Sequence, residues 1–283
     1  MSKASVSVII PCYCCSGTIR RAVESVVQQT LQPAEVILVD DASRDETLSV
    51  LKALQEEYSS DWIKILSLES NGGPSVARNA AWNIATQDYI AFLDADNAWH
   101  KDKILIQYYW MLANPQALLS GHTIPIVFSY EKFLSTRNIS FKQDIKYNRI
   151  SKEEILRSNP FETSSIMLQR DIKYRFDISK RYSEDYFLWQ QICLDGHPCF
   201  LLNVQLSYIF NSFGTAGLTS RILKMRLGDF NNYWQLWRKH KISVQTMIFM
   251  IFCSAMKFLA LMIIGPEKYS LMKHRIIFGH YET

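Results

Sequence analysis

Apolar and polar positions along the first hundred residues follow two different periods. Four apolar runs, rich in β-branched residues, have the continuous pattern typical of strands buried on both faces. They are VSVII (6–10), EVILVDD (35–41), IKILSLE (63–69) and DYIAFLDAD (88–96). Between these runs, apolar residues recur at the three- and four-residue spacing of helices. Strands alternating with helices predict an α/β fold with a mainly parallel, Rossmann-like sheet flanked by helices.

The remainder of the chain has a less regular pattern. Apolar runs predict strands at 123–130 and 163–170. Two further helical stretches, at 220–239 and 242–264, predict a helical C-terminal extension.

Three serines mark expected helix starts. Ser43 opens a run to Glu46 that has the form of a capping box. Ser151 is expected to cap a short helix, and Ser183 to cap a helix that ends before Gly196.

Unusual polar segments follow the four predicted strands at their carboxyl ends. They are Pro11-Cys12-Tyr13, Asp40-Asp41, Asn71-Gly72-Gly73 and Asp94-Ala95-Asp96. In an open parallel sheet these ends lie along one edge, and ligands bind in the crevice outside it. We therefore expect one ligand site built from all four segments, because independent surface residues would be scattered.

Asp94 and Asp96 flank a small residue at the end of the fourth predicted strand. Mg²⁺ and Mn²⁺ usually take one or two carboxylates, and water and substrate phosphates complete their coordination. Capping of the following turn is the alternative role for these acids. Their position at the common edge favours a metal site.

Asp41 and Arg78 are candidate ligand contacts at the same edge. An acid in the position of Asp41 can accept hydrogen bonds from a base or a ribose, and capping of the next helix is the alternative. The glycine turn at 72–73 begins a helix that carries Arg78 near its N-terminus, where a diphosphate would be attracted. A solvated Arg beside ordinary helix caps is the alternative there.

Four segments in the same order resemble the nucleotide-sugar-binding half of an inverting glycosyltransferase of family 2 with the GT-A fold. The segments are VSVIIPCY, VESVVQQTLQPAEVILVDDASRDET, NGGPSVARNAAW and YIAFLDADN. The resemblance implies a metal–diphosphate motif made of Asp94 and Asp96, with Asp96 as the more direct metal ligand. The implied contacts with the nucleotide sugar are Pro11, Tyr13, Asp41, Arg78 and Asp94.

The resemblance extends to ETSSIMLQRDI and SEDYFLWQQI. The family's acid in the second segment serves as a general base, which implies that role for Asp185, with Glu184 beside it. From the residues alone, two acids in a first helical turn are typical partners of the helix dipole. Cys14, Ala42 and Asn97 depart from residues frequent in the family, so the choice of sugar stays open.

The resemblance implies metal-dependent, inverting transfer of a hexosyl or N-acetylhexosaminyl group, with Mn²⁺ or Mg²⁺ as cofactor. The expected donor is a UDP-sugar, and the expected acceptor is a saccharide or a polyprenyl-diphosphate-linked saccharide in cell-surface polysaccharide synthesis. The alternatives are an inactive nucleotide-sugar-binding protein and a nucleotidyltransferase, although no Gly-rich phosphate loop stands near the N-terminus. A receiver-like signalling module would be about half as long and would not need Asp185.

We expect one domain in two parts, followed by an extension. Residues 1–110 would form the nucleotide-sugar-binding half, 111–215 the acceptor-binding half, and 216–283 a helical, basic tail. Residues 221–283 carry ten Lys and Arg against three Asp and Glu, although the net charge of the chain is only +4. A basic tail on an acidic body differs from the basic stripe of nucleic-acid-binding proteins and suits an anionic membrane surface.

The apolar stretch 242–264 is long enough to span a bilayer, but Gln245, Ser254 and Lys257 interrupt it. We expect a helix that lies in the membrane interface; the alternatives are packing on the protein body, a dimer contact and a spanning helix. The apolar run before Pro11 is too short for a signal peptide. We therefore expect a cytoplasmic protein, peripheral on the inner face of the cytoplasmic membrane.

Cys12, Cys14 and Cys15 raise the question of a metal or redox centre. A zinc site needs a second pair of ligands at suitable spacing, and Cys193 and Cys199 lie far along the chain and form no Cys-x-x-Cys pair. A disulfide within so tight a loop would be strained. We expect free thiols that fill the loop.

Overall fold

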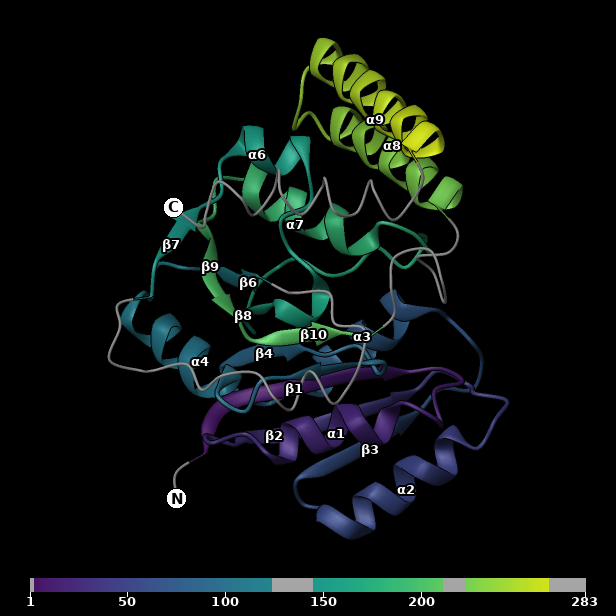
Figure 1. Cartoon of the computed structure of the whole chain (residues 1–283), viewed down its shortest axis with the longest axis vertical. Helices are drawn as coiled ribbons and strands as arrows, with labels where there is room; N and C mark the ends of the chain where they lie inside the picture. Colours follow the sequence, from purple (N-terminus) through teal and green to yellow (C-terminus); the bar gives the residue numbers. More distant parts are fainter. Residues whose placement is uncertain (1–2, 124–144, 211–221, 265–283) are drawn as a thin grey trace.

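The computed structural model describes residues 3–123, 145–210 and 222–264 of the 283-residue chain. Within this part, an eight-stranded sheet has the strand order β3-β2-β1-β4-β8-β6-β9-β7 (Figure 1). Its strands are β1 Ala4–Cys12, β2 Pro33–Asp40, β3 Ile63–Ser67, β4 Tyr89–Phe92, β6 Leu119–Thr123, β7 Tyr147–Arg149, β8 Met167–Gln169 and β9 Cys199–Gln205. A separate antiparallel ribbon pairs β5 Asn97–Trp99 with β10 Ser207–Ile209.

Helices pack on both faces of the sheet (Figure 1). They are α1 Ile19–Val27, α2 Thr47–Tyr58, α3 Pro74–Ile84, α4 Lys103–Ala113, α6 Lys152–Arg157, α7 Glu184–Leu194, α8 Ile222–Arg238 and α9 Val244–Ile264, with a 3₁₀ turn, η1, at Thr163–Ser165. One core contains side chains of α1, α2 and α4, and the other contains side chains of α3, α6 and α7. Strand β1 serves both cores, because Val8 and Ile10 face the first and Ile9 faces the second.

Strands β3, β2, β1 and β4 are parallel neighbours, as the four apolar runs predicted. Their carboxyl ends therefore lie on one edge of the sheet. The second half differs, because β8 runs antiparallel to both β4 and β6. The mainly parallel α/β fold expected from the sequence is confirmed.

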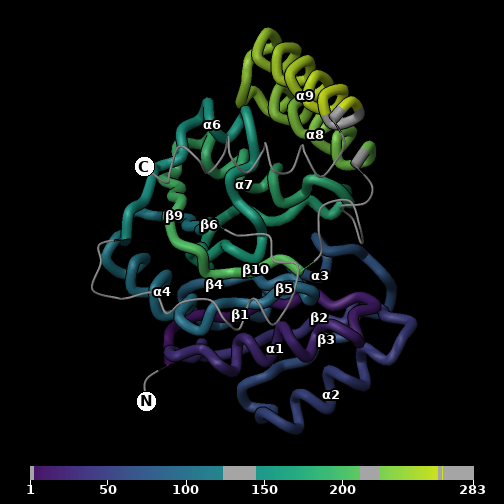
Figure 2. The backbone as a smooth tube through the Cα atoms, viewed as in Figure 1, coloured from purple at the N-terminus to yellow at the C-terminus, as the bar shows by residue number. Residues whose placement is uncertain are grey.

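The C-terminal helices α8 and α9 form a hairpin at one end of the molecule, the end away from α2 (Figure 2). Leu236 and Tyr233 of α8 and Met250 of α9 pack with Phe187 and Leu194 of α7 in a third, smaller core. The two predicted helical stretches of the tail are thus confirmed. Among the helices that the structure describes, none combines the length and the hydropathy needed to cross a bilayer.

Several boundaries differ from their predictions. The predicted strand at 163–170 begins with the η1 turn, and only Met167–Gln169 pair as β8. Strand β4 stops at Phe92, so Asp94 and Asp96 lie in the turn beyond it. Most of the strand predicted at 123–130 lies outside the described residues; β6 ends at Thr123.

The three serine caps have three different outcomes. The capping box at Ser151 is confirmed, since its hydroxyl accepts from Glu154 N at 3.1 Å and its own N–H donates to Glu154 at 2.8 Å. The one at Ser43 is wrong, because α2 begins at Thr47 and the Ser43 hydroxyl accepts from Cys14 N instead. Ser183 occupies the N-cap position of α7 but makes no capping hydrogen bond.

Candidate active site

The loops after β1, β2 and β3 are tied to one another at the carboxyl edge of the sheet. The N–H of Asp41 donates to the carbonyl of Cys12 at 2.9 Å, and the N–H of Leu68 donates to the carbonyl of Asp40 at 2.9 Å. Tyr13, the residue after Cys12, is 47% exposed. Pro11 is still part of β1, where it pairs in register with Val39, so it precedes the loop and does not belong to it.

Asp41 organises the turn that begins α3. Its carboxylate accepts from the backbone N–H groups of Gly72 and Gly73, each at 2.8 Å, and from the Asn71 amide at 3.0 Å. Gly73 has a φ of +85°, a conformation that suits glycine. Burial raises the pKa of Asp41, while the Gly72 and Gly73 N–H groups act against that rise. Base contact by Asp41 therefore stays a prediction, and its observed role is to hold this turn.

Arg181 lies on the same turn and was not singled out from the sequence. Its guanidinium donates to the Asn71 side chain at 3.0 Å and stands beside Gly73, and its positive charge also acts on Asp41. The contact joins residues 110 positions apart. No local motif marks Arg181, so only the folded structure identifies it as an exposed cation at the predicted ligand edge.

Arg78 joins the two acidic motifs. Its Nη2 donates to Asp94 at 2.8 Å and its Nη1 donates to Glu184 at 3.0 Å, and the Arg78 and Glu184 side chains are both less than one-tenth exposed. Burial acts to lower the pKa of Arg78, but the charges of Asp94 and Glu184 outweigh it and raise that pKa. The alternative of a solvated Arg is wrong. The ion pairs hold the turn after β4 beside the first turn of α7.

The turn that contains Asp94 and Asp96 is held by hydrogen bonds with Ser164 and Arg21. The Ser164 hydroxyl accepts from Asp94 N at 3.1 Å and from the Asn97 amide at 2.9 Å. Arg21 donates to the carbonyl of Asp96, and β5 begins at the next residue. Both Asp side chains remain half-buried, so part of each reaches the surface.

The donor set of this turn suits a hard divalent cation. Among the described residues, no three His, Cys, Asp or Glu side chains gather into a complete metal cage. Mg²⁺ and Mn²⁺ need no such cage, because one or two carboxylates and substrate phosphates satisfy them. Asp94 and Asp96 therefore fit the metal that the sequence predicted, although one oxygen of Asp94 is engaged by Arg78.

Asp185 is the second residue of α7 and is half-buried. Its Oδ2 accepts a 3.3 Å hydrogen bond from Thr163 in the η1 turn. Burial raises the pKa of Asp185 to about 7, and the nearby carboxylates of Glu184 and Glu162 add to the rise, against the charge of Arg78. A carboxyl group poised near neutrality can accept a proton at physiological pH.

The six cysteines are free thiols. Cys12 is buried at the end of β1, Cys14 is exposed and Cys15 is half-buried. Cys14 and Cys15 lie in the first loop of the ligand edge, as expected, whereas Cys12 still belongs to β1 and packs in the first core.

A model of glycosyl transferase family 2 matches residues 7–175, more than half of the chain. The chain belongs to this family. It is a glycosyltransferase, and its fold is the GT-A type expected from the sequence.

Two curated relatives come from Escherichia coli. They are the UDP-Glc:alpha-D-GlcNAc-diphosphoundecaprenol beta-1,3-glucosyltransferases WfgD and WfaP. WfgD is 31% identical over 70% of this chain and 73% of its own length, and WfaP is 31% identical over 68% and 71%. The similarity places this chain beside glucosyltransferases that are named for a diphosphoundecaprenol-linked GlcNAc acceptor.

Solved structures share the fold at low identity. Mannosyltransferase PcManGT from Pyrobaculum calidifontis, in complex with GDP-Man and Mn²⁺, has a TM-score of 0.66 and 16% identity, covering 96% of this chain and 79% of its own. TarS from S. aureus in complex with UDP has a TM-score of 0.58 and 21% identity, covering 82% of this chain; this chain spans 65% of that TarS chain.

Proposed function

We propose that this protein transfers a hexosyl or N-acetylhexosaminyl group, with inversion, from a UDP-sugar to a hydroxyl of a lipid-linked saccharide in cell-surface polysaccharide synthesis. The observation that supports it most directly is the Arg78 bridge. It joins the Asp94 turn to the first turn of α7, where Asp185 has a pKa near neutrality. The proposed diphosphate site and the proposed proton acceptor would thus belong to one cluster.

Asp185 acts as the general base in this proposal. Its carboxylate takes the proton of the acceptor hydroxyl while the hydroxyl oxygen forms a bond to the anomeric carbon. The bond from that carbon to the diphosphate breaks, and its electron pair leaves with the diphosphate oxygen. One direct displacement inverts the anomeric configuration. Proton transfer of this kind contributes on the order of 10²–10⁴ in rate.

The acids of the turn after β4 serve the leaving group. When bound, Mn²⁺ or Mg²⁺ supplies positive charge against the departing diphosphate, and Asp96 and Asp94 are the residues that would hold it. Arg78 keeps Asp94 in place and places a fixed positive charge behind it. Tyr13 and Asp41, and the exposed Arg181 beside Asp41, are the proposed surroundings of the nucleotide.

The donor and acceptor are proposed from the relatives. WfgD and WfaP are named for UDP-Glc and for a GlcNAc-diphosphoundecaprenol acceptor, and TarS was solved with UDP and with UDP-GlcNAc. We therefore propose a UDP-sugar donor and a polyprenyl-diphosphate-linked saccharide acceptor.

A donor screen tests this function. Purified protein is incubated with UDP- and GDP-sugars, Mn²⁺ or Mg²⁺, and a GlcNAc-diphosphoryl polyprenol, and nucleoside-diphosphate release is followed. We expect acceptor-dependent UDP release, loss of it in Asp185→Asn, and a β-linked product from an α-linked donor by NMR. Donor binding without release in the wild type would instead favour the inactive binding protein, and pyrophosphate release from a nucleoside triphosphate a nucleotidyltransferase.

We also propose that the α8–α9 hairpin contacts an anionic bilayer at the inner face of the cytoplasmic membrane. Large apolar side chains are exposed along one face of α9, most of them at spacings of three and four residues. This apolar stripe consists of Val244, Ile248, Phe249, Phe252, Met256, Leu259 and Ile263. A contiguous apolar stripe on a protein surface marks an interaction site. Amphipathic helices with one such apolar face lie in the membrane interface.

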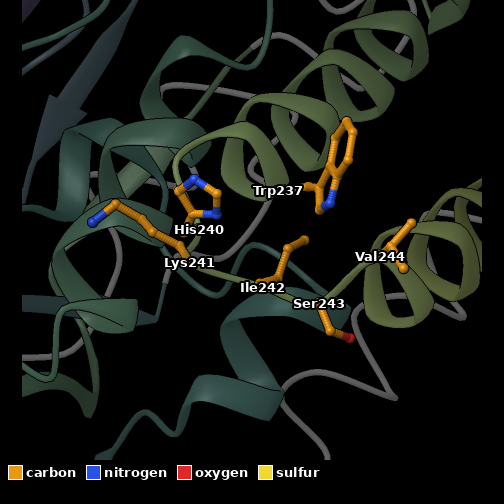
Figure 3. Close-up of a pocket in the computed structure, with 6 residues that line it drawn as sticks. All are labelled: Trp237, His240, Lys241, Ile242, Ser243 and Val244. Carbon is orange, nitrogen blue, oxygen red and sulfur yellow. The ribbon is translucent and has the colours of Figure 1, made fainter.

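The turn between the two helices carries residue types that are typical of proteins at the lipid headgroup layer. An open hollow of about 440 Å³ lies there, lined by Trp237, His240, Lys241, Ile242, Ser243 and Val244 (Figure 3). Trp237 stands on one side and Val244 on the other, while Lys241 extends away to pair with Asp195 (Figure 3). None of these residues belongs to the cluster around Asp185. Tryptophan beside cationic residues is typical of the membrane–water boundary.

Vesicle sedimentation tests the membrane contact. We expect the protein to pellet with phosphatidylglycerol-containing vesicles and less with phosphatidylcholine alone, because the hairpin is basic as well as apolar. Ile248→Ser/Phe252→Ser should reduce pelleting, whereas Leu112→Ser, an exposed apolar residue on α4, should not. A concentration-dependent dimer in ultracentrifugation that the same double substitution abolishes, without vesicle binding, would assign the stripe to self-association.

A further inference from the structure

The residue before the two acids of α7 has an unusual backbone conformation. Ser183 has φ 54° and ψ 27°, in the left-handed region. A residue with a side chain pays a conformational cost there, and such a conformation persists only when its surroundings enforce it. Because Glu184 and Asp185 follow directly, the conformation of Ser183 sets the direction in which α7 begins.

Helix α8 supplies the groups that hold Ser183. The Ser183 hydroxyl donates to Asp229 Oδ1 at 2.8 Å and lies 3.1 Å from a second acceptor, the carbonyl of Met225. The amide of Asn232 donates to the Ser183 carbonyl at 2.9 Å. Asp229 is itself oriented by Arg226, at 3.0 Å from its other oxygen. These polar groups of α8 fix both the side chain and the carbonyl of one residue.

Neighbouring residues of α8 extend the same contact. Gly228 packs against Tyr182 so closely that a Cβ there would stand 2.8 Å from the Tyr182 carbonyl oxygen. Lys180 donates through its ammonium to the side chain of Asn231. Residues 225–232 of α8 therefore pack along residues 180–183.

The same carbonyl also starts α7. The N–H of Phe187 donates to the Ser183 carbonyl at 3.0 Å, while Asn232 donates to it from α8. Loss of the Asn232 or Asp229 contact would allow Ser183 to relax toward an ordinary backbone conformation. That change would rotate the first turn of α7 and with it the carboxyl group of Asp185.

We propose that Asp229 and Asn232 are positioning residues for the transfer reaction: they hold Ser183 in its left-handed conformation and so aim Asp185. This inference rests on the proposed role of Asp185 as general base. It adds a function to the hairpin, because the helix that carries Trp234 and Trp237 at the surface also holds the start of the catalytic helix.

Kinetics of Asp229→Ala and Asn232→Ala test the proposal, with Tyr233→Phe as the matched control. Tyr233 also anchors α8 to the body: its hydroxyl donates a buried hydrogen bond to the Leu156 carbonyl at 3.0 Å and interacts with the Tyr186 hydroxyl, and the bond to Leu156 does not involve residues 180–183. We expect kcat to fall roughly ten- to a hundredfold in both alanine variants, because small misplacement of a reacting group is costly. The KM for the UDP-sugar should stay within about twofold.

A conservative variant separates positioning from general loss of stability. Asp229→Asn keeps an oxygen that can accept from Ser183, so it should recover most of the kcat lost in Asp229→Ala. Tyr233→Phe should lower the melting temperature about as much as the alanine variants but keep kcat. Where Asp229→Ala reduces the yield of folded protein, Asn232→Ala carries the test, since it removes a single side-chain donor.

The outcomes distinguish this inference from the proposed function. If Asp185→Asn is inactive while Asp229→Ala and Asn232→Ala keep the kcat of Tyr233→Phe, the positioning role is refuted and the base assignment stands. If Asp185→Asn retains wild-type kcat, the base assignment fails and the positioning role fails with it.

Discussion

At the scale of single residues, the first turn of α7 holds two acids in contrasting states. Glu184 is buried and paired with the guanidinium of Arg78. Asp185 accepts a longer hydrogen bond, from Thr163, and burial favours its protonated form. Environments that differ for two neighbouring carboxyl groups are the usual means of dividing framework and proton-transfer roles.

The pH dependence of kcat follows from this environment. Because the pKa of Asp185 is raised to about 7, the acid is mostly protonated below that pH and cannot accept a proton. We expect kcat to rise through about pH 7 and to level off above it, measured at saturating donor and acceptor. Glu162→Gln removes one of the carboxylates that raise this pKa, so the midpoint should move to lower pH. An unchanged midpoint in Glu162→Gln would contradict this electrostatic account.

The same raised pKa predicts that Asp185 lowers stability at high pH. A carboxyl group that binds its proton more tightly when folded gives stability at low pH that is lost as pH rises from about 4 to about 7. Asp185→Asn does not titrate, so its advantage should grow over that interval to about 1–3 kcal/mol at pH 8. Urea unfolding at pH 5 and pH 8 measures the difference. Equal differences in unfolding free energy at the two pH values would show that ionisation of Asp185 does not destabilise the folded state.

The sequence could identify these residues only where a motif marked them. Asp185 was found through the family pattern, since two acids at a helix start are common for reasons of dipole alone. Thr163 and Ser164 lie in the matched segment ETSSIMLQRDI, but the sequence assigns them no role. Their roles arise from contacts of Ser164 with Asp94 and of Thr163 with Asp185, 70 and 22 positions away, which exist only in the folded chain.

At the scale of elements, buried strands were predictable and helix starts were less so. The four parallel strands show a continuous apolar pattern because both faces are covered. The Ser43 capping box failed because Cys14, across the ligand edge, competes for that hydroxyl. The Ser183 cap failed because α8 engages the same hydroxyl. A local sequence pattern does not reveal a residue elsewhere in the chain that hydrogen-bonds to the capping group.

Arg78 connects three elements, α3, the turn after β4, and α7. We expect Arg78→Met to abolish transfer and to destabilise the protein by about 3–5 kcal/mol, because Asp94 and Glu184 would lose their buried partner. Chemical denaturation at pH 7.5 measures this loss. Arg20→Met removes a surface pair with Glu57 and should change stability little. Similar losses in the two variants would mean that the Arg78 bridge is not a structural joint.

At the scale of the whole molecule, the two roles proposed for the hairpin are ones that the sequence could not join. Composition showed a basic, apolar tail, and periodicity showed two helices. Neither showed that α8 contacts the start of α7 through Asp229 and Asn232, because side-chain contacts across 46 and 49 positions leave no local pattern. The apolar stripe proposed to face a bilayer and the residues proposed to position Asp185 therefore belong to one helical hairpin, the stripe to α9 and the positioning residues to α8.

This arrangement predicts that the two roles of the hairpin can be separated. Ile248→Ser/Phe252→Ser changes only exposed positions of α9, so activity on a short-chain, water-soluble acceptor should remain near that of the wild type. Activity on a long-chain acceptor in anionic vesicles should fall about tenfold or more, because less enzyme occupies the surface. Asn232→Ala should instead reduce both activities by the same factor. Equal losses on both acceptors in the α9 variant would show that its stripe supports the catalytic fold and not membrane contact.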